Sequence, residues 1–525
     1  MKKGETKYIF VLGGVLSGVG KGITAASIGA ILQAKGLKVS IQKCEPYLNV
    51  DADTISPAEH GECFVTHDGA LTDLDLGHYE RFLDIETNQN STTLAGELLQ
   101  ELIAKERIGG FNGQTVQLTP HLTDMIQDSI ERAGQGSDVH ICEIGGTVGD
   151  YESLSFIEAI RLFSNRVGRQ NVLYTAVVYV PWLDISKEFK TKPAQNALKD
   201  MRSFGIIPDI VGVRTHKPAP KSVGDKIAKF SGVNSDAVVL LPDIKSVYDV
   251  PLNVLKSGIL SVLNDFTNNN IVPDMKDWHS LSTARAKEYG QTVKVGMVTQ
   301  YPGNESAYLS AVEALKAAAC ANKVNLSISW IDAREAGAFG IEAVDGVLVP
   351  GGKSDHSTEG VVALAKSALI ADKPYLGLCW GMQIAAIAAA GLGCGCTTGS
   401  EESGQRFNKV VSRLKIKPDK PKPSGVVRLG NHQSTLIEGS KTAKAYGRLQ
   451  VTERYGCSYE VDSAFLHWIN AGGLQVSGTS SDGEIIDFME SPVNRFYVAT
   501  QGHPEFNSRP MRPHPLFVEF IRALK

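Results

Sequence analysis

Short apolar runs rich in β-branched residues alternate, in the first half of the chain, with longer segments whose apolar residues recur at helical spacing. Such alternation is typical of strands joined by helices, which form a parallel sheet covered on both faces. The pattern predicts strands at residues 8–12, 39–43, 139–144, 172–180, 209–213 and 237–241.

A second series of the same kind begins after a polar stretch near residues 264–290. It predicts a helix at 306–321 and strands at 293–299, 326–331, 346–349 and 375–378. We therefore expect an α/β protein with two doubly wound parallel-sheet domains, at 1–266 and 293–525, joined by a linker at 267–292. The Lys/Pro-rich stretch 417–425 is predicted to be a solvated loop.

Composition narrows the class of protein. A chain of 525 residues with 42% hydrophobic residues can bury a sizeable core, and its net charge of -4 argues against nucleic-acid or membrane-surface binding. No apolar run reaches the roughly 18 residues of a membrane span, and no signal-peptide core is visible, so a cytoplasmic protein is expected. Eight cysteines are scattered, with Cys394 and Cys396 the only close pair, and reduced thiols are expected.

A glycine-rich loop, GGVLSGVGKG at residues 13–22, follows the first predicted strand and precedes a predicted helix. A P-loop reads G-x-x-x-x-G-K-[ST], whereas Val15 replaces its first glycine and Gly22 its metal-binding hydroxyl. The loop is a phosphate site or a purely structural turn, and its strand-to-helix context favours the phosphate site.

A magnesium ion at this loop would need carboxylates from elsewhere, because Gly22 has no side chain to offer. Residues 73–80 and 143–150 supply acidic groups. Glu143 ends an apolar strand, at the edge where open α/β sheets bind ligands. The alternative is that Glu143 is a solvent-exposed surface residue, as most acidic residues are. Its position at the end of a strand favours a metal ligand instead.

A candidate nucleophile lies in the second domain. Cys379 stands in G-x-C-x-G between a predicted strand and a helix, a tight turn that exposes its central side chain. The alternative is a small buried cysteine. The near-terminal His503-Pro-Glu505 supplies a base and an orienting carboxylate, and the glycines after strand 346–349 supply N–H groups for an oxyanion.

The motifs P-G-G, G-x-C-x-G-x-Q and H-P-E, in this order, resemble those of the class I glutamine amidotransferase domain. The resemblance implies that Cys379 attacks the glutamine amide and releases ammonia, assisted by His503 and Glu505. It also implies an oxyanion hole from Gly352 and the Trp380 backbone, and glutamine contacts from Gly351, Gln383 and, more loosely aligned, Glu401.

The first domain is similar to the synthetase half of the cytidine triphosphate synthase family. The motifs are G-G-V-x-S-x-x-G-K-G, K-x-x-P-Y-x-N-V-D, H-G-E-x-F-V-T, D-G-A-x-T-D-L-D-L-G-H-Y-E-R-F, T-V-Q, E-I-G-G-T-V-G-D-x-E-S and K-T-K-P. The resemblance spans nearly the whole chain. It implies a ligase of pyrimidine biosynthesis that phosphorylates the uracil 4-oxygen of UTP with ATP and then displaces the phosphate with tunnelled ammonia.

The resemblance further implies Mg²⁺ and ATP as cofactors, GTP as an allosteric activator, CTP as a feedback inhibitor, and assembly into homotetramers or filaments. It assigns Mg²⁺ to Asp75 and Glu143, and places His60 beside the ammonia passage. The implied ATP-binding residues are Ser17, Gly18, Val19, Gly20, Lys21, Gly22 and Lys43. The implied UTP- or CTP-binding residues are Ser17, Gln117, Asp150, Glu152, Lys190, Lys192, Gln195 and Lys226. Without the motifs, Lys190 and Lys226 would be ordinary surface charges.

The chain departs from the family mainly in the second domain. After P-G-G the usual F-G-x-R-G-x-E-G is replaced by residues 353–360, KSDHSTEG, which alters the glutamine lid and its response to GTP. The usual R-H-R-Y-E-V is replaced by residues 456–461, GCSYEV, so Ser458 stands where an arginine near the glutamine carboxylate is expected. Loss of an Arg–carboxylate fork weakens binding of the carboxylate.

Three alternatives to a working glutamine-dependent ligase remain open at this point. They are an ammonia-dependent ligase with an impaired glutaminase, a nucleotide-binding structural or regulatory subunit that forms filaments, and an ATPase with an unrelated amidase-like domain. Intact Lys21, Asp75 and Glu143 argue against a pure scaffold, which has no chemical need for them.

Overall fold

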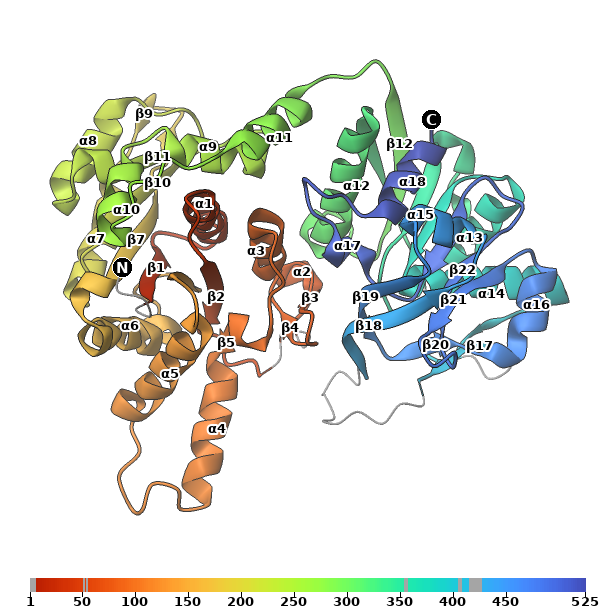
Figure 1. The fold of residues 1–525 in the computed structure, drawn as a ribbon, viewed down its shortest axis with the longest axis horizontal. Coiled ribbons are helices and arrows are strands. Elements are labelled where there is room, and N and C mark those ends of the chain that lie inside the picture. The colour runs from red at the N-terminus through yellow and green to blue at the C-terminus, as the bar shows by residue number, and fades with distance from the viewer. Residues whose placement is uncertain (1–5, 51, 53–54, 354–356, 405–407, 415–426) are drawn as a thin grey trace. The chain divides into compact units, whose positions relative to one another are not determined.

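The computed structural model describes residues 6–50, 52, 55–353, 357–404, 408–414 and 427–525. The predicted loop at 417–425 and residues 354–356 of the altered segment lie outside the described residues. The chain divides into two compact units (Figure 1). The first comprises Met1–Ala52 and Asp75–Ala286, and the second comprises Asp53–Leu74 and Lys287–Lys525.

The first unit is built on a 7-stranded parallel sheet in the order β11-β10-β7-β1-β6-β2-β5. The six predicted strands are all present, and β5 is the one that the pattern missed. The strands are β1 Lys7–Gly13, β2 Val39–Glu45, β5 Thr92–Leu94, β6 Val139–Ile144, β7 Val172–Tyr179, β10 Ile210–Thr215 and β11 Val238–Pro242.

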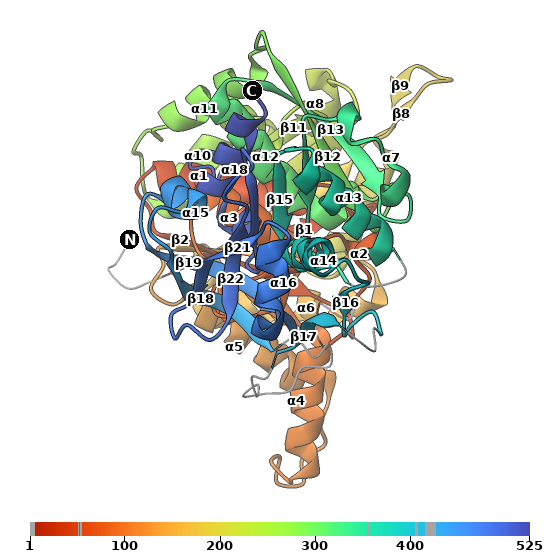
Figure 2. The same ribbon diagram turned by 90° about the vertical axis from the view of Figure 1, so that its right-hand side faces the viewer.

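Helices cover both faces of this sheet, which is why β1 and β6 are buried along their whole length. Helix α4 and the small β8–β9 hairpin, Trp182–Leu183 and Glu188–Phe189, project away from the body of the unit (Figure 2). The helices are α1 Lys21–Ala34, α3 Asp75–Leu83, α4 Ala95–Arg107, α5 Thr123–Gly134, α6 Leu154–Val167, α7 Lys192–Ser203, α8 Lys221–Ser231, α9 Val250–Leu255, α10 Ile259–Thr267 and α11 Lys276–Ala286.

The division into units differs from the boundaries expected from sequence. Helix α11 lies inside the predicted linker but belongs to the first unit, where Trp278 packs against Phe82 at 5.4 Å between ring centroids. Residues 53–74 precede α3 in the chain but belong to the second unit. Because one polar stretch in the sequence is the only signal of a boundary, the excursion at 53–74 could not be anticipated.

The second unit contains a 9-stranded sheet in the order β13-β12-β14-β15-β23-β22-β21-β18-β19. The predicted strands form its parallel half, which ends at β23. The other half is antiparallel and was not predicted. The strands are β12 Thr292–Thr299, β13 Asn325–Asp332, β14 Gly346–Val349, β15 Tyr375–Leu378, β18 Arg428–Leu436, β19 Gln450–Cys457, β21 Gln475–Ser480, β22 Ile486–Glu490 and β23 Tyr497–Thr500.

Smaller sheets and eight helices complete the described part of the second unit. The short strands are β3 Phe64–Val65, β4 Leu71–Thr72, β16 Gly399–Ser400, β17 Lys409–Arg413 and β20 Tyr459–Val461. The helices are α2 Pro57–His60, α12 Leu309–Asn322, α13 Thr358–Ile370, α14 Trp380–Cys394, α15 Lys441–Tyr446, α16 Leu466–Ala471, α17 Pro504–Asn507 and α18 Pro515–Ala523. Among the described residues, no helix combines the length and the apolar character that a membrane span requires.

The segment 53–74 is held by buried polar contacts within the second unit. The carboxylate of Glu62 accepts hydrogen bonds from the backbone N–H of Ser310, at 2.8 Å, and from its hydroxyl. The Arg454 guanidinium donates to the carbonyl oxygen of Val65 at 3.1 Å. These contacts satisfy groups on both sides, so the segment is an integral part of this unit.

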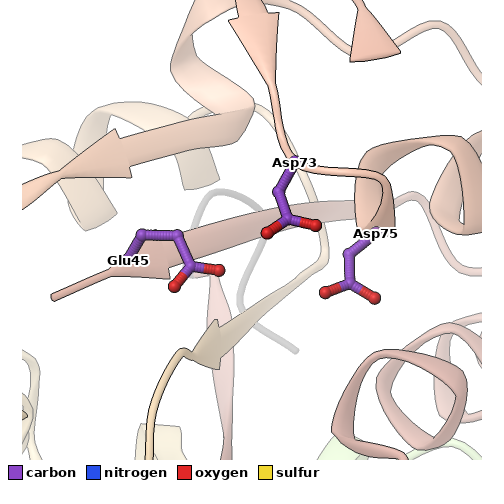
Figure 3. Close-up of side chains that lie close together, drawn as sticks. All are labelled: Glu45, Asp73 and Asp75. Carbon is purple, nitrogen blue, oxygen red and sulfur yellow. The ribbon is translucent and has the colours of Figure 1, made fainter. Parts of the chain in front are cut away.

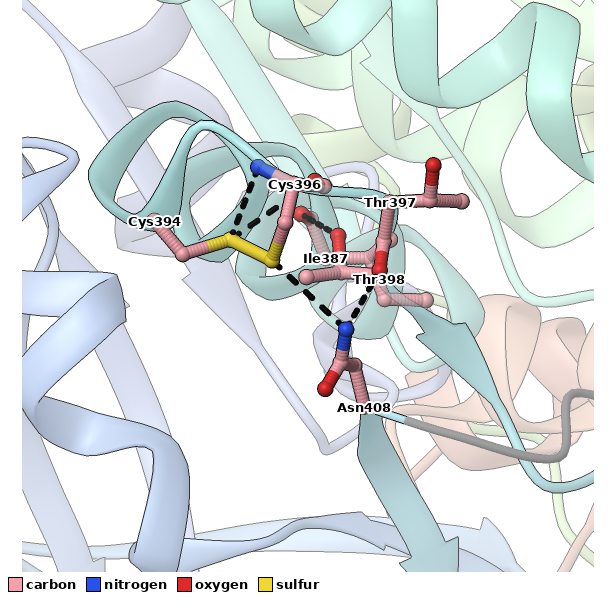
Figure 4. The surroundings of a disulfide bond; sticks show 6 residues. All are labelled: Ile387, Cys394, Cys396, Thr397, Thr398 and Asn408. Carbon is pink, nitrogen blue, oxygen red and sulfur yellow. Dashed lines mark hydrogen bonds between the residues drawn. A yellow bond between two sulfur atoms is a disulfide. The ribbon is translucent and has the colours of Figure 1, made fainter.

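The expectation of reduced thiols is wrong for one pair, because Cys394 and Cys396 form a disulfide bond (Figure 4). Helix α14 ends in a left-handed turn at Gly395, with φ 63°, and the turn brings the two Cα atoms to 5.2 Å. The Asn408 amide donates to the carbonyl oxygen of Thr397 at 2.9 Å beside the bridge. The other six cysteines are free thiols.

Candidate active sites

The glycine-rich loop joins β1 to α1, as expected. Gly20 caps the helix with φ 94°, Gly18 has φ 70°, and Val15 adopts φ 85° although it is β-branched. Such a conformation is strained for a valine, and strain of this kind concentrates at ligand-binding loops. The Lys21 side chain turns inward and donates to the carbonyl oxygen of Gly146 at 2.8 Å.

The ammonium group of Lys43 gathers three carboxylates at the carboxyl ends of β2 and β6. It pairs with Asp75, with Glu143 at 2.9 Å and with Glu45 at 3.2 Å. Burial lowers the pKa of Lys43, but Asp75, Glu143 and Glu45 outweigh it and hold the pKa well above its usual range. Lys43 therefore stays charged.

Two further contacts shape this cluster. The buried Tyr79 hydroxyl donates to Glu143. The backbone of Gly22 approaches both acids so closely that a β-carbon there would lie 2.5 Å from Asp75 Oδ1 and 3.1 Å from Glu143 Oε2. Burial, partly offset by Lys43, raises the pKa of Glu143. The structure brings together Asp75 and Glu143, the two residues assigned to Mg²⁺, and Tyr79 and Glu45 join them.

Figure 3 shows a second grouping around Asp75. Within the first unit, Glu45 at the end of β2 and Asp75 at the start of α3 each offer a carboxylate oxygen, and these two atoms lie within 4.8 Å of each other. The acids Asp75 and Glu143 already converge on one cation, the Lys43 ammonium, and carboxylate oxygens are the donors that Mg²⁺ prefers. The residues present therefore fit a magnesium ion.

A cavity of about 400 Å³ borders the loop at Gly18 and Gly20. Its lining is largely apolar, with Ile23, Leu241 and Val247 among the side chains, and Arg214 and Asp243 add charge. These two form an ion pair at 2.5 Å. A cavity of this size beside a phosphate loop suits a planar base. Sequence reasoning missed it, although Arg214 and Asp243 both stand at the carboxyl ends of strands, where the sheet-edge rule could have indicated them.

The residues assigned to UTP or CTP fall on several elements of the first unit. Lys190 pairs with Glu188 at 2.5 Å in the β8–β9 hairpin. The pKa of Glu188 is lowered mainly by hydrogen bonds from Lys190 and Ser186, and the charge of Lys226 on α8 adds a smaller effect, so Lys226 also lies in the neighbourhood of this carboxylate.

The remaining members of this set are distributed as follows. Gln195 is buried on α7 and donates to Thr191 Oγ1 at 3.0 Å. Lys192 begins the same helix. Gln117, Asp150 and Glu152 are exposed, the last two following β6. His60 ends α2 of the second unit and is partly exposed.

Cys379 occupies a strained turn between β15 and α14, with φ 51° and ψ -104°. Its backbone N–H donates to Thr500 at 2.8 Å, which ties the turn to β23. A side chain held in this conformation projects from the edge of the sheet, as the nucleophile of a strand–turn–helix site must. The turn is the one predicted.

His503 follows β23 and lies between Cys379 and Glu505. Its Nδ1 is 2.7 Å from Glu505 Oε1, and Cys379 lies close enough to raise the pKa of the imidazole. Burial lowers the pKa of His503, but the charges of Glu505 and Cys379 overcome this and raise the pKa well above its usual range. The imidazole can therefore hold the thiol proton, which is what a Cys–His nucleophile needs.

The glycines predicted to line this site are closely packed. A β-carbon at Gly351 would lie 2.8 Å from His503 Cε1, and one at Gly352 would lie 2.9 Å from Trp380 Cε3. Only glycine fits at these positions. Gln383 and Cys379 are linked through Gln501, which donates to Cys379 Sγ at 3.6 Å and accepts from Gln383 at 3.4 Å.

Glu401, expected to contact glutamine, and Arg454, which is close to Ser458 in the sequence, both have other contacts. Glu401 accepts from the backbone N–H of Arg413 at 3.0 Å and is partly exposed. Arg454 is fully buried, bound to Val65 and set over the Phe64 ring, so it does not replace the arginine lost at Ser458.

Comparison with known proteins gives matches over both units. The family described as CTP synthase N-terminus matches residues 7–268, and Glutamine amidotransferase class-I matches residues 306–523. The CTP synthase of Methanocaldococcus jannaschii is 42% identical over 530 residues, covering 98% of this chain and 98% of its own. Those of Halalkalibacterium halodurans, at 42%, and Carboxydothermus hydrogenoformans, at 43%, each cover 99% of this chain and at least 98% of their own.

A solved structure of the Trypanosoma brucei CTPS glutaminase domain with bound acivicin also matches. It is 29% identical and covers 44% of this chain and 93% of its own, with a TM-score of 0.40.

Proposed function

This chain belongs to the CTP synthase family, and from that premise we propose that it aminates UTP to CTP with ammonia taken from glutamine, at the expense of ATP. The observation that carries the proposal is the presence, in one chain, of a lysine–carboxylate cluster beside a phosphate loop and of a Cys379–His503–Glu505 set. The first suits phosphoryl transfer and the second suits amide hydrolysis.

In the synthetase reaction, residues 17–22 surround the phosphates of ATP, and Lys21 and Lys43 neutralise their charge. The cavity beside Gly18 and Gly20 takes the adenine. Asp75 and Glu143 would hold Mg²⁺, which would supply positive charge to offset that of the phosphates. Lys43 is already charged in the cluster, and this supports its role.

In the glutaminase reaction, the Cys379 thiol gives its proton to His503 and attacks the glutamine carboxamide. Glu505 keeps the imidazole oriented through its 2.7 Å contact with Nδ1. The Gly352 and Trp380 backbone N–H groups receive the developing oxyanion, and His503 returns the proton to the leaving ammonia. Gly351, Gln383 and Glu401 are the proposed glutamine contacts.

The pyrimidine nucleotide is assigned to the polar set of the first unit. Lys190, which pairs with Glu188, and Lys226, in the neighbourhood of the same carboxylate, supply positive charge for its phosphates. His60 is assigned to the ammonia passage, GTP to activation and CTP to feedback inhibition. The residues proposed for UTP or CTP are Ser17, Gln117, Asp150, Glu152, Lys190, Lys192, Gln195 and Lys226. Homotetramer assembly and a cytoplasmic location stay predictions, the first testable by light scattering.

The test is CTP formation from UTP and ATP with either glutamine or ammonium as nitrogen donor, with and without GTP. We expect product from both donors in the parent protein, and from ammonium alone in Cys379→Ala. The matched control Cys320→Ala removes a partly exposed thiol of α12 and should keep both activities. The proposal would be overturned if the parent protein formed no CTP from glutamine and none from ammonium. Activity with ammonium alone would identify an ammonia-dependent ligase instead.

A further inference from the structure

A second free thiol shares the surroundings of the nucleophile. Cys379 and Cys457 belong to one small buried cluster with Leu414 and Tyr455. Their exposed fractions are 8% and 4%. The proposed glutaminase reaction uses the Cys379 thiol and gives the Cys457 thiol no role.

Cys457 is held in place by its strand. It is the last residue of β19 and pairs with Arg428 across the antiparallel β18–β19 ladder. The next residue, Ser458, accepts from the backbone N–H of Leu414 at 2.9 Å, which fixes the chain beyond the strand. The thiol is therefore presented to the cluster by a rigid backbone. It also lies in the GCSYEV stretch that departs from the family pattern, which makes it a feature of this chain.

The two thiols differ in chemical character. Burial, and then the charge on Cys379, raise the pKa of Cys457 well above its usual range, so Cys457 stays a neutral thiol. Cys379 lies beside His503, which can hold its proton. A reactive sulfur next to a protonated one is the arrangement in which an oxidised cysteine is captured by a resolving thiol.

We propose that Cys457 is a resolving thiol that captures Cys379 after its oxidation by a hydroperoxide, closing a disulfide that switches the glutaminase off reversibly. The inactivation rests on the proposed glutaminase function, whereas the disulfide itself does not. The switch would protect Cys379 from oxidation to the sulfinic and sulfonic acids. Thiols do not reverse these later steps, whereas the sulfenic acid is reversible.

The chemistry balances in two steps. The Cys379 thiolate attacks the hydroperoxide, so an S–O bond forms and the O–O bond breaks, and the leaving alkoxide or hydroxide takes the proton held by His503. Cys379 is then a sulfenic acid. The Cys457 thiol attacks its sulfur, an S–S bond forms, and the sulfenic oxygen leaves as water with the Cys457 proton. Two equivalents of an external thiol reduce the disulfide and restore both cysteines.

The experiment treats the full-length protein with hydrogen peroxide and then with dithiothreitol. Glutaminase activity should fall with peroxide and return on reduction, while ammonium-dependent CTP formation stays within about twofold of the start. Mass spectrometry of a non-reduced digest should find a peptide that joins Cys379 to Cys457. This peptide is detected whether or not the protein hydrolyses glutamine, so failure of the switch and failure of the proposed function are distinguishable.

Variants complete the test. Cys457→Ala and Cys457→Ser should keep their starting glutaminase activity, form no linked peptide, and lose most of the recovery after reduction as Cys379 reaches the sulfinic acid. Ammonium-dependent activity checks that each variant folds. Cys320→Ala, and the pair Cys394→Ser with Cys396→Ser, should recover like the parent. The proposal is overturned if the parent yields no Cys379–Cys457 peptide, or if the Cys457 variants recover as fully as the parent.

Discussion

The backbone of Gly22 lies against the carboxylate of Asp75, and a β-carbon at position 22 would stand 2.5 Å from Asp75 Oδ1. A loop that kept the usual serine or threonine after its lysine would fill the space that Asp75 and Glu143 now occupy. The missing hydroxyl and the two incoming carboxylates are thus parts of one arrangement. Gly22 is required by the neighbours of the loop, and its φ lies outside the left-handed region.

The first prediction concerns this close approach. Gly22→Ala should push Asp75 away from Lys43 and lower CTP formation about 10²-fold with glutamine and with ammonium alike, because displacements near 1 Å at a reacting site have such effects. Glutamine hydrolysis should be unchanged. Gly224→Ala is the control, since a β-carbon on that α8 residue meets nothing closer than 3.7 Å. Equal CTP rates in the two variants would contradict the argument.

Asp75 itself provides the second prediction. Asp75→Asn keeps the shape of the side chain but removes the charge that pairs with Lys43, so ATP-dependent CTP formation should fall about 10³-fold with either donor, as for other groups that balance phosphoryl charge. The assay is initial rate against Mg²⁺ concentration. Asp200→Asn, at an exposed position on α7, should behave like the parent. Full activity in Asp75→Asn would show that the metal is assigned to the wrong carboxylates.

The third prediction concerns the hydrogen bond that the Tyr79 hydroxyl donates to Glu143. Tyr79→Phe removes the hydroxyl that donates to this buried carboxylate, and a hydrogen bond to a charged group is worth about 1.5–3 kcal/mol. Denaturant unfolding of the first unit should show a loss of that size, and CTP formation should need more Mg²⁺. Tyr151→Phe is the matched control, because that side chain is 90% exposed. Unchanged stability in Tyr79→Phe would refute the role.

The fourth prediction follows from the raised pKa of His503. Among the groups that raise the pKa of His503, Glu505 makes the largest contribution, so Glu505→Gln should lower this pKa. The thiolate–imidazolium pair exists only below the pKa of His503, and the alkaline limb of the glutaminase kcat/KM profile should therefore move to lower pH. The profile is measured between about pH 6 and pH 10. Glu484→Gln, on the surface, should leave the limb in place, and a limb unmoved in Glu505→Gln would contradict the assignment.

Much of the fold could be predicted because the parallel strands are buried on both faces. β14 and β15 match their predicted bounds residue for residue, and β6 does so in the first unit. β18 could not be found, since its sequence RLGNHQSTL has few apolar residues and its stability comes from pairing with β19 and β21.

The candidate sites likewise contain some residues that a local motif identifies and others that only the folded structure identifies. Cys379, His503 and Glu505 stand in local motifs, and the structure brings them together. The roles of Arg214 and Tyr79 depend on the neighbours that they meet in the folded structure, Asp243 and Glu143, and their places at a strand end and in a motif do not identify those neighbours. The disulfide was missed because an expectation drawn from cellular compartment says nothing of a turn that brings two thiols together.

The excursion at 53–74 has a consequence for gene architecture. Because Glu62 and Val65 satisfy Ser310 and Arg454 of the second unit, a split gene cut once near residue 287 would yield a C-terminal fragment with those partners missing. A two-gene version of this protein needs the short segment copied onto the fragment that ends at Lys525. Fusion in a single polypeptide is therefore built into the fold, and natural or designed fission must restore residues 53–74 to succeed.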